Sequence, residues 1–245
     1  MDRMIYTAAS GAKSMMQRQE VLANNLANVN TPGYRSEQVA FRVAPLVGDG
    51  LPTRAMVAES TPRADFSPGV IATTGRTLDV AIQGPGFFAV QGTDGTEGYT
   101  RNGAFDLNAE GQLVTSSGAP VLGEGGPISI PPGNVISIAA DGSISAAPAN
   151  TPRNSTPVGR LKLVNPDTRS LTRGVDGLFR STDGEANADA SVRVAGGAIE
   201  GSNVNAVEAM VGMIALARQF DLQMKLMQAA DSASRKGAQL LGAIA

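Results

Sequence analysis

Apolar residues recur at steps of three and four positions near both ends of the chain, which is the spacing of one face of an α-helix. The first stripe predicts a helix from about Arg3 to Val29, and the second predicts a helix from Asn205 to Leu241. The first stripe comprises Ile5, Ala8, Ala12, Met15, Leu22, Leu26 and Val29. The second comprises Met210, Met213, Ile214, Ala217, Phe220, Met224, Met227 and Leu241.

Both stripes are narrow and rich in Ala and Met, so neither helix buries much surface alone. This pattern favours pairing of the two termini as a coiled coil, alone or with neighbouring chains, over two helices packed on a globular core. The stripe residues are therefore the expected assembly interface. Asn203 or Ser202 is the expected N-cap of the second helix.

The middle of the chain has a different composition and a different pattern of apolar residues. All 14 prolines lie between Pro32 and Pro166, so long helices are restricted to the two ends. Short apolar runs separated by Gly-rich turns predict antiparallel strands. The runs are 78–82, 87–90, 112–115, 128–130, 135–138 and 161–164, and the Asp-Gly turns are at 49–50, 94–95, 141–142, 176–177 and 183–184. Residues 139–157 are expected to form a surface loop.

Seven aromatic residues fall in this middle region, as a packed β core requires: Phe41, Phe66, Phe87, Phe88, Tyr99, Phe105 and Phe179. The predicted fold class is α+β, with N- and C-terminal helices pairing as a coiled coil and a central antiparallel β domain. The predicted parts are an N-terminal helix segment over 1–36, a β domain over 37–199 and a C-terminal helix segment over 200–245.

Composition removes several kinds of chemistry. The 245 residues include no His, Cys or Trp, so common zinc sites, His-based triads and disulfides are excluded. A net charge of −2 gives no indication of a nucleic-acid partner. The N-terminus lacks the apolar region of a signal peptide, and no apolar run approaches the ~20 residues of a membrane span. We expect no cofactor, no metal and no membrane insertion.

Two features resemble functional sites only in part. Residues 106–111 look like the start of a calcium loop, but Ser117 stands where the bidentate Glu belongs. The best acid–base candidates occupy mostly turn-like positions without a nucleophile beside them: Asp79, Asp94, Asp106 and Asp141. We therefore expect a protein that is not an enzyme. A carboxylate-based hydrolase is the third choice, after the two functions that the following paragraphs give.

Several blocks of sequence point to one family. The segment 23–34 contains the motif residues Asn24, Asn25, Leu26, Ala27, Asn28, Thr31, Gly33 and Tyr34. Further blocks lie at 2–8, 78–90, 99–105, 111–114, 120–123, 158–164 and 200–205. In this order they resemble the bacterial flagellar axial proteins, within the rod and hook branch. The nearest type is the proximal rod, and the alternatives are the distal-rod type or a secreted β-rich adhesin or binding module.

The resemblance implies a structural role. In that family the terminal helices form an inner coiled-coil layer that lines the export channel, and the rod transmits torque. The implied partners are other proximal and distal rod proteins, copies of the same chain and the flagellar type III export apparatus. The implied location is the basal body in the periplasm, reached without a cleavable signal peptide.

Overall fold

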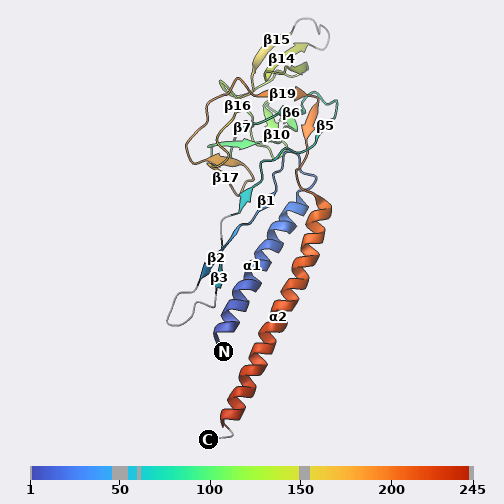
Figure 1. Ribbon diagram of the computed structural model, residues 1–245. Helices are drawn as coiled ribbons and strands as arrows, with labels where there is room; N and C mark the ends of the chain where they lie inside the picture. Colours follow the sequence, from blue (N-terminus) through green and yellow to red (C-terminus); the bar gives the residue numbers. More distant parts are fainter. Residues whose placement is uncertain (1, 46–54, 60–61, 149–154, 243–245) are drawn as a thin grey trace. The chain divides into compact units, whose positions relative to one another are not determined.

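One long helix lies at each end of the sequence, and the residues between them form short strands (Figure 1). The computed structural model describes residues 2–45, 55–59, 62–148 and 155–242. Helix α1 spans Asp2–Ala27 and helix α2 spans Ala206–Gly242. The α+β class predicted from the sequence is therefore confirmed. Helix α1 ends just before the Asn-Thr-Pro-Gly stop signal, which blocks further helical hydrogen bonding.

The contacts of the chain fall into two compact units. The helical unit comprises Met1–Ala27, Glu37–Asp65 and Asn205–Ala245, and the β unit comprises Asn28–Ser36 and Phe66–Val204. These groups differ from the parts predicted at 1–36, 37–199 and 200–245. Residues 28–36 and 200–204 group with the β strands, whereas 37–65 group with the helices. Whether the predicted parts fold on their own stays a prediction.

In the helical unit, α1 and α2 run antiparallel and side by side (Figure 1). A methyl group at Gly11 would lie 3.4 Å from the side chain of Gln223, and one at Gly212 would lie 3.0 Å from Leu22. Small residues thus let the two helices approach closely. In the described residues, no helix is long and apolar enough to cross a membrane.

Two strand pairs belong to the helical unit. Strand β1 (Glu37–Gln38) pairs with β4 (Arg63–Ala64), and β2 (Phe41–Pro45) pairs with β3 (Ala55–Glu59), both antiparallel. The Arg18 guanidinium of α1 lies 4.5 Å from the ring centroid of Phe41 in β2. Phe41 was expected in the β core, and this expectation is wrong. Its ring serves as a platform for a cation on α1 instead.

The β unit is built from short strands that pair antiparallel. Its largest sheet has the order β16-β7-β8-β18-β17, a second has the order β13-β14-β15, and four further pairs are β9–β10, β11–β12, β6–β19 and β5–β20. The strands are β5 (Ile71–Thr73), β6 (Val80–Gln83), β7 (Phe87–Gln91), β8 (Glu97–Thr100), β9 (Phe105–Leu107), β10 (Leu113–Thr115), β11 (Leu122–Gly123), β12 (Gly126–Pro127), β13 (Asn134–Ile138), β14 (Ser143–Pro148), β15 (Thr156–Arg160), β16 (Leu163–Val164), β17 (Leu171–Arg173), β18 (Phe179–Ser181), β19 (Arg193–Gly196) and β20 (Ala198–Glu200).

Aromatic side chains pack inside the β unit as the sequence predicted. The rings of Phe88 and Phe105 meet edge to face with centroids 5.1 Å apart, and both side chains are buried. The ring of Phe66 lies 5.8 Å from that of Phe87 and 5.2 Å from that of Phe179. Aromatic pairs of this geometry stabilise a core beyond the area that they bury.

The surface loop predicted over 139–157 is wrong for its described residues. Strand β14 lies within that range and β15 begins there, and the two pair with a register shift between Ile144 and Ser145. Ile144 and Ala146 are buried on one face of β14. The strand was missed because Ala and Ser carry a weak strand signal, so only alternation marks the buried face. The Asp-Gly pair at 49–50 lies outside the described residues.

Candidate assembly surface and junction site

One face of α2 contacts α1, and its phase differs by one residue from much of the predicted stripe. The least exposed positions of α2 follow steps of three and four, as at a coiled-coil seam. This inner face consists of Ala209, Met213, Leu216, Phe220, Gln223, Met227 and Ala230. Met213, Phe220 and Met227 were among the residues predicted from the sequence.

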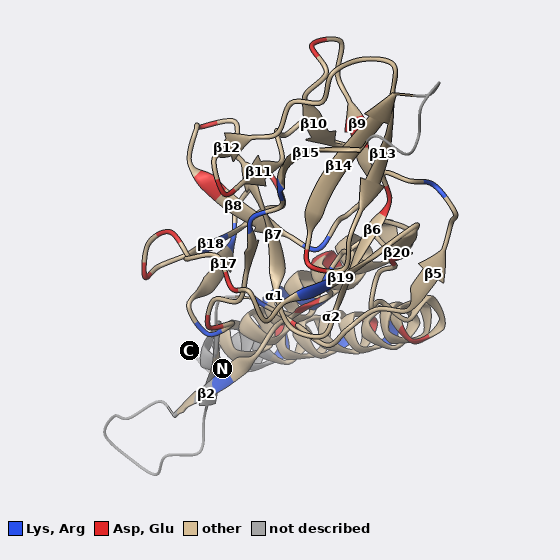
Figure 2. Cartoon of the chain, turned by 90° about the horizontal axis from the view of Figure 1, so that it is seen from above, with Lys and Arg blue, Asp and Glu red and all other residues tan. Residues whose placement is uncertain are grey.

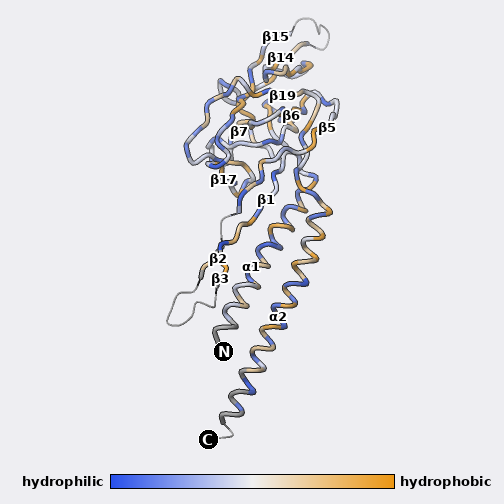
Figure 3. The backbone as a smooth tube through the Cα atoms, viewed as in Figure 1, coloured by the Kyte–Doolittle hydropathy of each residue, from blue (hydrophilic) through white to orange (hydrophobic). Residues whose placement is uncertain are grey.

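The remaining predicted residues of α2 point elsewhere. Met210 is 45% exposed and Ile214 is 57% exposed, while Ala217 and Met224 are also exposed. The tube in Figure 3 shows hydrophobic stretches along much of α2. We call the apolar residues on this side the outer face of α2: Val207, Met210, Val211, Ile214, Leu222, Met224 and Leu226. The helix therefore carries one apolar face against α1 and a second apolar face that the described residues of this chain leave exposed.

On α1 the predicted residues are largely covered. Ala12 is buried, and Ala8, Met15, Leu22 and Leu26 are partly buried. Val29 is also partly buried, although it follows the end of the helix. The side chains of Ile5 and Leu241 lie outside the described residues. Charges of both signs are interspersed along the helices, without a large block of one sign (Figure 2).

The first half of the predicted family motif fastens the end of α1 within the helical unit. The buried side chain of Asn25 donates to the carbonyl of Glu37 at 2.8 Å and accepts from the amide of Glu37 at 2.8 Å. An Asn amide is the right group for this exchange, because it offers both a donor and an acceptor. Asn24 and Ala27 are exposed, and Asn28 is partly buried.

The second half of the motif forms part of the β unit. Asn28 accepts a hydrogen bond from the Thr31 hydroxyl at 3.1 Å, and the amide of Tyr34 donates to the carbonyl of Thr31. Gly33 has φ +68° and lies against the backbone of Arg101, where a methyl group would be 2.3 Å from the Arg101 carbonyl carbon. The position thus requires glycine both for its conformation and for its close approach.

A buried ionic cluster lies beside Gly33 in the same unit. The guanidinium of Arg35 contacts one carboxylate oxygen of Glu200 at 2.8 Å, and that of Arg101 contacts the other at 3.2 Å. The three side chains are at most 5% exposed. Burial lowers the pKa of Arg101 to about 10, the Glu200 carboxylate acts to raise it, and Arg35 acts to lower it.

Sequence reasoning missed this cluster. Arg35 and Glu200 are 165 positions apart, and nothing in their local sequence indicates that they meet. The only signal was that 200–205 forms one of the family-like blocks. Asn205, in that block, is the N-cap of α2, because its side chain accepts from the amides of Val207 at 3.1 Å and Glu208 at 3.3 Å. The predicted caps Asn203 and Ser202 are therefore wrong.

The acid–base candidates serve turns and ion pairs. Asp94 accepts from Thr96, Asp141 accepts from Ser143, and Asp106 pairs with Arg76 at 2.7 Å. In the calcium-like stretch, the Asn108 side chain accepts from the amides of residues 110 and 112, which makes the segment a turn. Within the described ranges, no three acidic side chains gather so that they could hold a metal ion.

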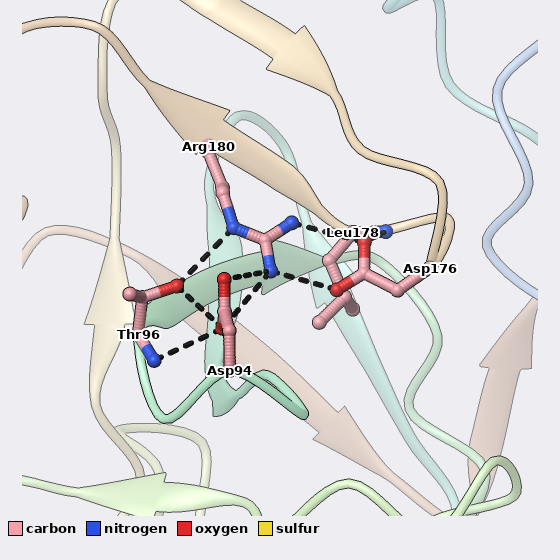
Figure 4. Close-up of polar contacts among 5 residues, drawn as sticks. All are labelled: Asp94, Thr96, Asp176, Leu178 and Arg180. Carbon is pink, nitrogen blue, oxygen red and sulfur yellow. Dashed lines mark hydrogen bonds and ion pairs between the residues drawn. The ribbon is translucent and has the colours of Figure 1, made fainter.

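Arg180 joins two Asp-Gly turns of the β unit (Figure 4). Its guanidinium contacts Asp176 at 2.7 Å and Asp94 at 3.2 Å, so it ties the turn before β18 to the turn between β7 and β8. The Arg180 hydrogen bond holds the pKa of Asp176 below its usual value. For Asp94, hydrogen bonds from Thr96 lower the pKa most, with Arg180 adding to them.

This arrangement predicts an acid-sensitive β unit. An Asp with a lowered folded pKa adds stability above its unfolded pKa of about 3.9, and that stability is lost as the pH falls through the folded value. The Asp176→Asn variant should melt lower than the parent at pH 7 and lose less between pH 4 and pH 2. Thermal unfolding at several pH values tests this, and parallel curves for parent and variant would contradict it.

Comparisons with known proteins match three stretches of the chain to flagellar families. Residues 5–35 match the family described as flagella basal body rod protein, residues 81–146 match the flagellar hook protein FlgE/F/G D1 domain, and residues 195–240 match the flagellar basal body rod FlgEFG protein C-terminal family. The chain belongs to the family of flagellar basal-body rod proteins. It is a structural subunit of the flagellar basal-body rod rather than an enzyme.

Full-length relatives include FlgF proteins. The flagellar basal-body rod protein FlgF of Escherichia coli (strain K12) is 49% identical, and the alignment covers 98% of this chain and 99% of that protein. FlgF of Caulobacter vibrioides is 33% identical over 100% of both chains. FlgG of Buchnera aphidicola subsp. Schizaphis graminum is 30% identical over 96% of this chain and 98% of that protein.

Proposed function

We propose that α1 and α2 pair as a coiled coil and that the outer face of α2 packs against the helices of neighbouring rod subunits. The observation that carries this proposal is the second apolar face, with Val207, Val211 and Ile214 each more than half exposed. A helix that is apolar on two sides is suited to burial between partners on both sides. In this arrangement the packed helices form the inner layer of the rod and line the export channel.

The proposal also gives the β unit a role, outside the helical layer of the rod. We infer that it works as one antiparallel domain that contacts neighbouring subunits and carries torque along the rod. Its partners are other rod components and further copies of this chain, and its route is the flagellar type III export apparatus into the periplasm. The 49% identity to Escherichia coli FlgF over nearly the whole chain favours the proximal place of FlgF in the rod.

Charge placed on the outer face tests this proposal. Ile214 is 57% exposed in the single chain, so Ile214→Asp should change the melting of the purified protein little. In a rod, the variant loses about 1.5–3 kcal/mol of apolar burial per subunit and buries an unpaired carboxylate, which costs several kcal/mol more. Cells carrying Ile214→Asp should therefore fail to complete rods and should not swim.

The matched control is Gln219→Asp, which adds the same charge to the same helix at an exposed position that is already polar, at the edge of the outer face. It should reduce rod completion less. Normal rods in cells with Ile214→Asp would refute burial of the outer face. A large loss of thermal stability in the purified Ile214→Asp protein would mean that this face packs on its own chain.

A further inference from the structure

The chain passes between the helical unit and the β unit at four points, next to residues 28, 36, 66 and 204. On the β-unit side, the three segments that contain these points are 28–36, 66–70 and 200–204. They are bound to one another inside that unit. The carbonyl of Glu200 accepts from the amide of Gly33 at 2.8 Å, and the amide of Gly201 donates to the carbonyl of Val70 at 2.8 Å. A Cβ at Gly69 would lie 2.1 Å from the carbonyl oxygen of Gly201, so the segments touch.

Two side chains connect all three segments. One oxygen of the Glu200 carboxylate accepts from Arg35 at 2.8 Å and from the amide of Gly69 at 2.8 Å. The Asn203 side chain accepts from the amide of Ser36 at 2.7 Å and donates to the carbonyl of Ser67 at 3.0 Å. We call Arg35, Arg101, Glu200 and Asn203 the junction clamp.

The charge balance of the clamp is uneven. Two buried guanidinium groups share one buried carboxylate, and Nε and Nη1 of Arg35 have no hydrogen-bond partner among the described residues. Such a cluster is a weak source of net stability, because desolvation of the charges offsets their attraction. It does impose geometry, since each guanidinium must stay against the carboxylate to remain compensated. The cluster therefore fixes the relative positions of the segments that it joins more than it adds to the stability of the β unit.

We propose that the junction clamp is the joint through which torque passes between the helical unit and the β unit of each rod subunit. This inference rests on the proposed function of the chain in the rod. A chain crossing held only by backbone hydrogen bonds can open locally under load. The clamp ties together the three segments that contain these crossings through one carboxylate and one amide, so no segment can pull away without breaking a contact to Glu200 or Asn203.

Two variants loosen the clamp in different ways. Glu200→Gln removes the charge that both arginines share, and Asn203→Ala removes the ties to Ser36 and Ser67 without altering a buried charge. The matched control is Glu97→Gln, which makes the same chemical change at a carboxylate that is 6% exposed and pairs with Lys162 at 2.6 Å in the same unit. The Glu97 pair ties no crossing segment.

Three measurements on each variant decide the question. Hydrogen exchange of the purified full chain should show the amide of Ser36 in Asn203→Ala exchanging about tenfold faster, as expected for one lost hydrogen bond. The amide of Gly69 should also exchange faster in Glu200→Gln, because its bond to a carboxylate becomes a weaker bond to a neutral amide oxygen. Electron microscopy of basal bodies should show completed rods. Bead rotation on filament stubs should be normal at low load and should stall at a torque that the parent sustains, whereas Glu97→Gln should rotate as the parent does.

Two results would overturn the inference. One is parental rotation at high load by a variant whose amides exchange faster. The other is a failure to complete rods by a variant whose β unit melts normally, because the clamp would then act in assembly. If Glu200→Gln does not fold, Asn203→Ala is judged by the same results. Rod completion by the Ile214→Asp variant tests the proposed function separately, since the clamp test reads rotation of finished rods.

Discussion

Replacement of Gly33 by alanine is expected to destabilise the β unit by at least about 3 kcal/mol. The left-handed conformation at φ +68° alone costs an alanine about 1–2 kcal/mol. The added Cβ would also lie 2.3 Å from the carbonyl carbon of Arg101 and 2.3 Å from the amide nitrogen of Asn102. These are backbone atoms, so no flexible side chain can move aside, and the clamp segment that contains Arg35 must shift.

Gly75→Ala is the matched control for this prediction. Gly75 has nearly the same conformation, with φ +73°, but its Cβ would meet nothing within 4 Å. This variant should lose only the backbone strain, about 1–2 kcal/mol. Denaturant unfolding of both full-length proteins measures the difference, provided that the slope m stays constant. Equal midpoints for the two variants would show that the approach of Gly33 to Arg101 is not tight in solution.

The sequence was a good guide to the elements and a poorer guide to the phase of α2. Proline-free, periodic ends predicted both helices within two residues of their observed bounds. The predicted stripe of α2 combines residues of both faces, because the helix is apolar on two sides. Ala209 and Leu216 belong to the inner face together with the polar Gln223, whereas a search for an unbroken apolar row selects Met210, Ala217 and Met224. Periodicity alone cannot tell which apolar face meets its own chain.

The clamp was beyond the reach of local patterns for a different reason. Arg35 lies 165 positions before its partner Glu200, and a single Arg or Glu in a mixed sequence ordinarily indicates an exposed position. Strand β14 was missed because its Ala- and Ser-rich sequence resembles a loop until Ile144 and Ala146 are placed against the core. The family-like blocks marked the right stretches, including Gly33 and Glu200, but gave no role to either residue.

The boundaries of the β domain are also open to a direct test. Cutting at 36/37 and at 199/200, as the sequence suggests, removes Gly33, Arg35, Glu200 and Asn203 from the β unit. Arg101 would keep its hydrogen bond to the carbonyl of Gly84 at 2.7 Å but would lose its only carboxylate among the described residues. A buried cation that loses its partner costs about 3–5 kcal/mol.

A fragment of residues 28–204 is therefore expected to unfold cooperatively at a clearly higher denaturant concentration than a fragment of residues 37–199. The difference should approach the cost of the uncompensated Arg101 plus the backbone hydrogen bonds that Gly33 and Gly201 make with other segments. Both fragments should show β-type circular dichroism. The 28–204 fragment with Glu200→Gln separates the two contributions, because it keeps these backbone contacts and loses the shared charge. Its midpoint should fall between those of the other fragments. If 37–199 proves as stable as 28–204, the clamp segments add nothing to the β unit, and the boundaries suggested by the sequence are the right ones.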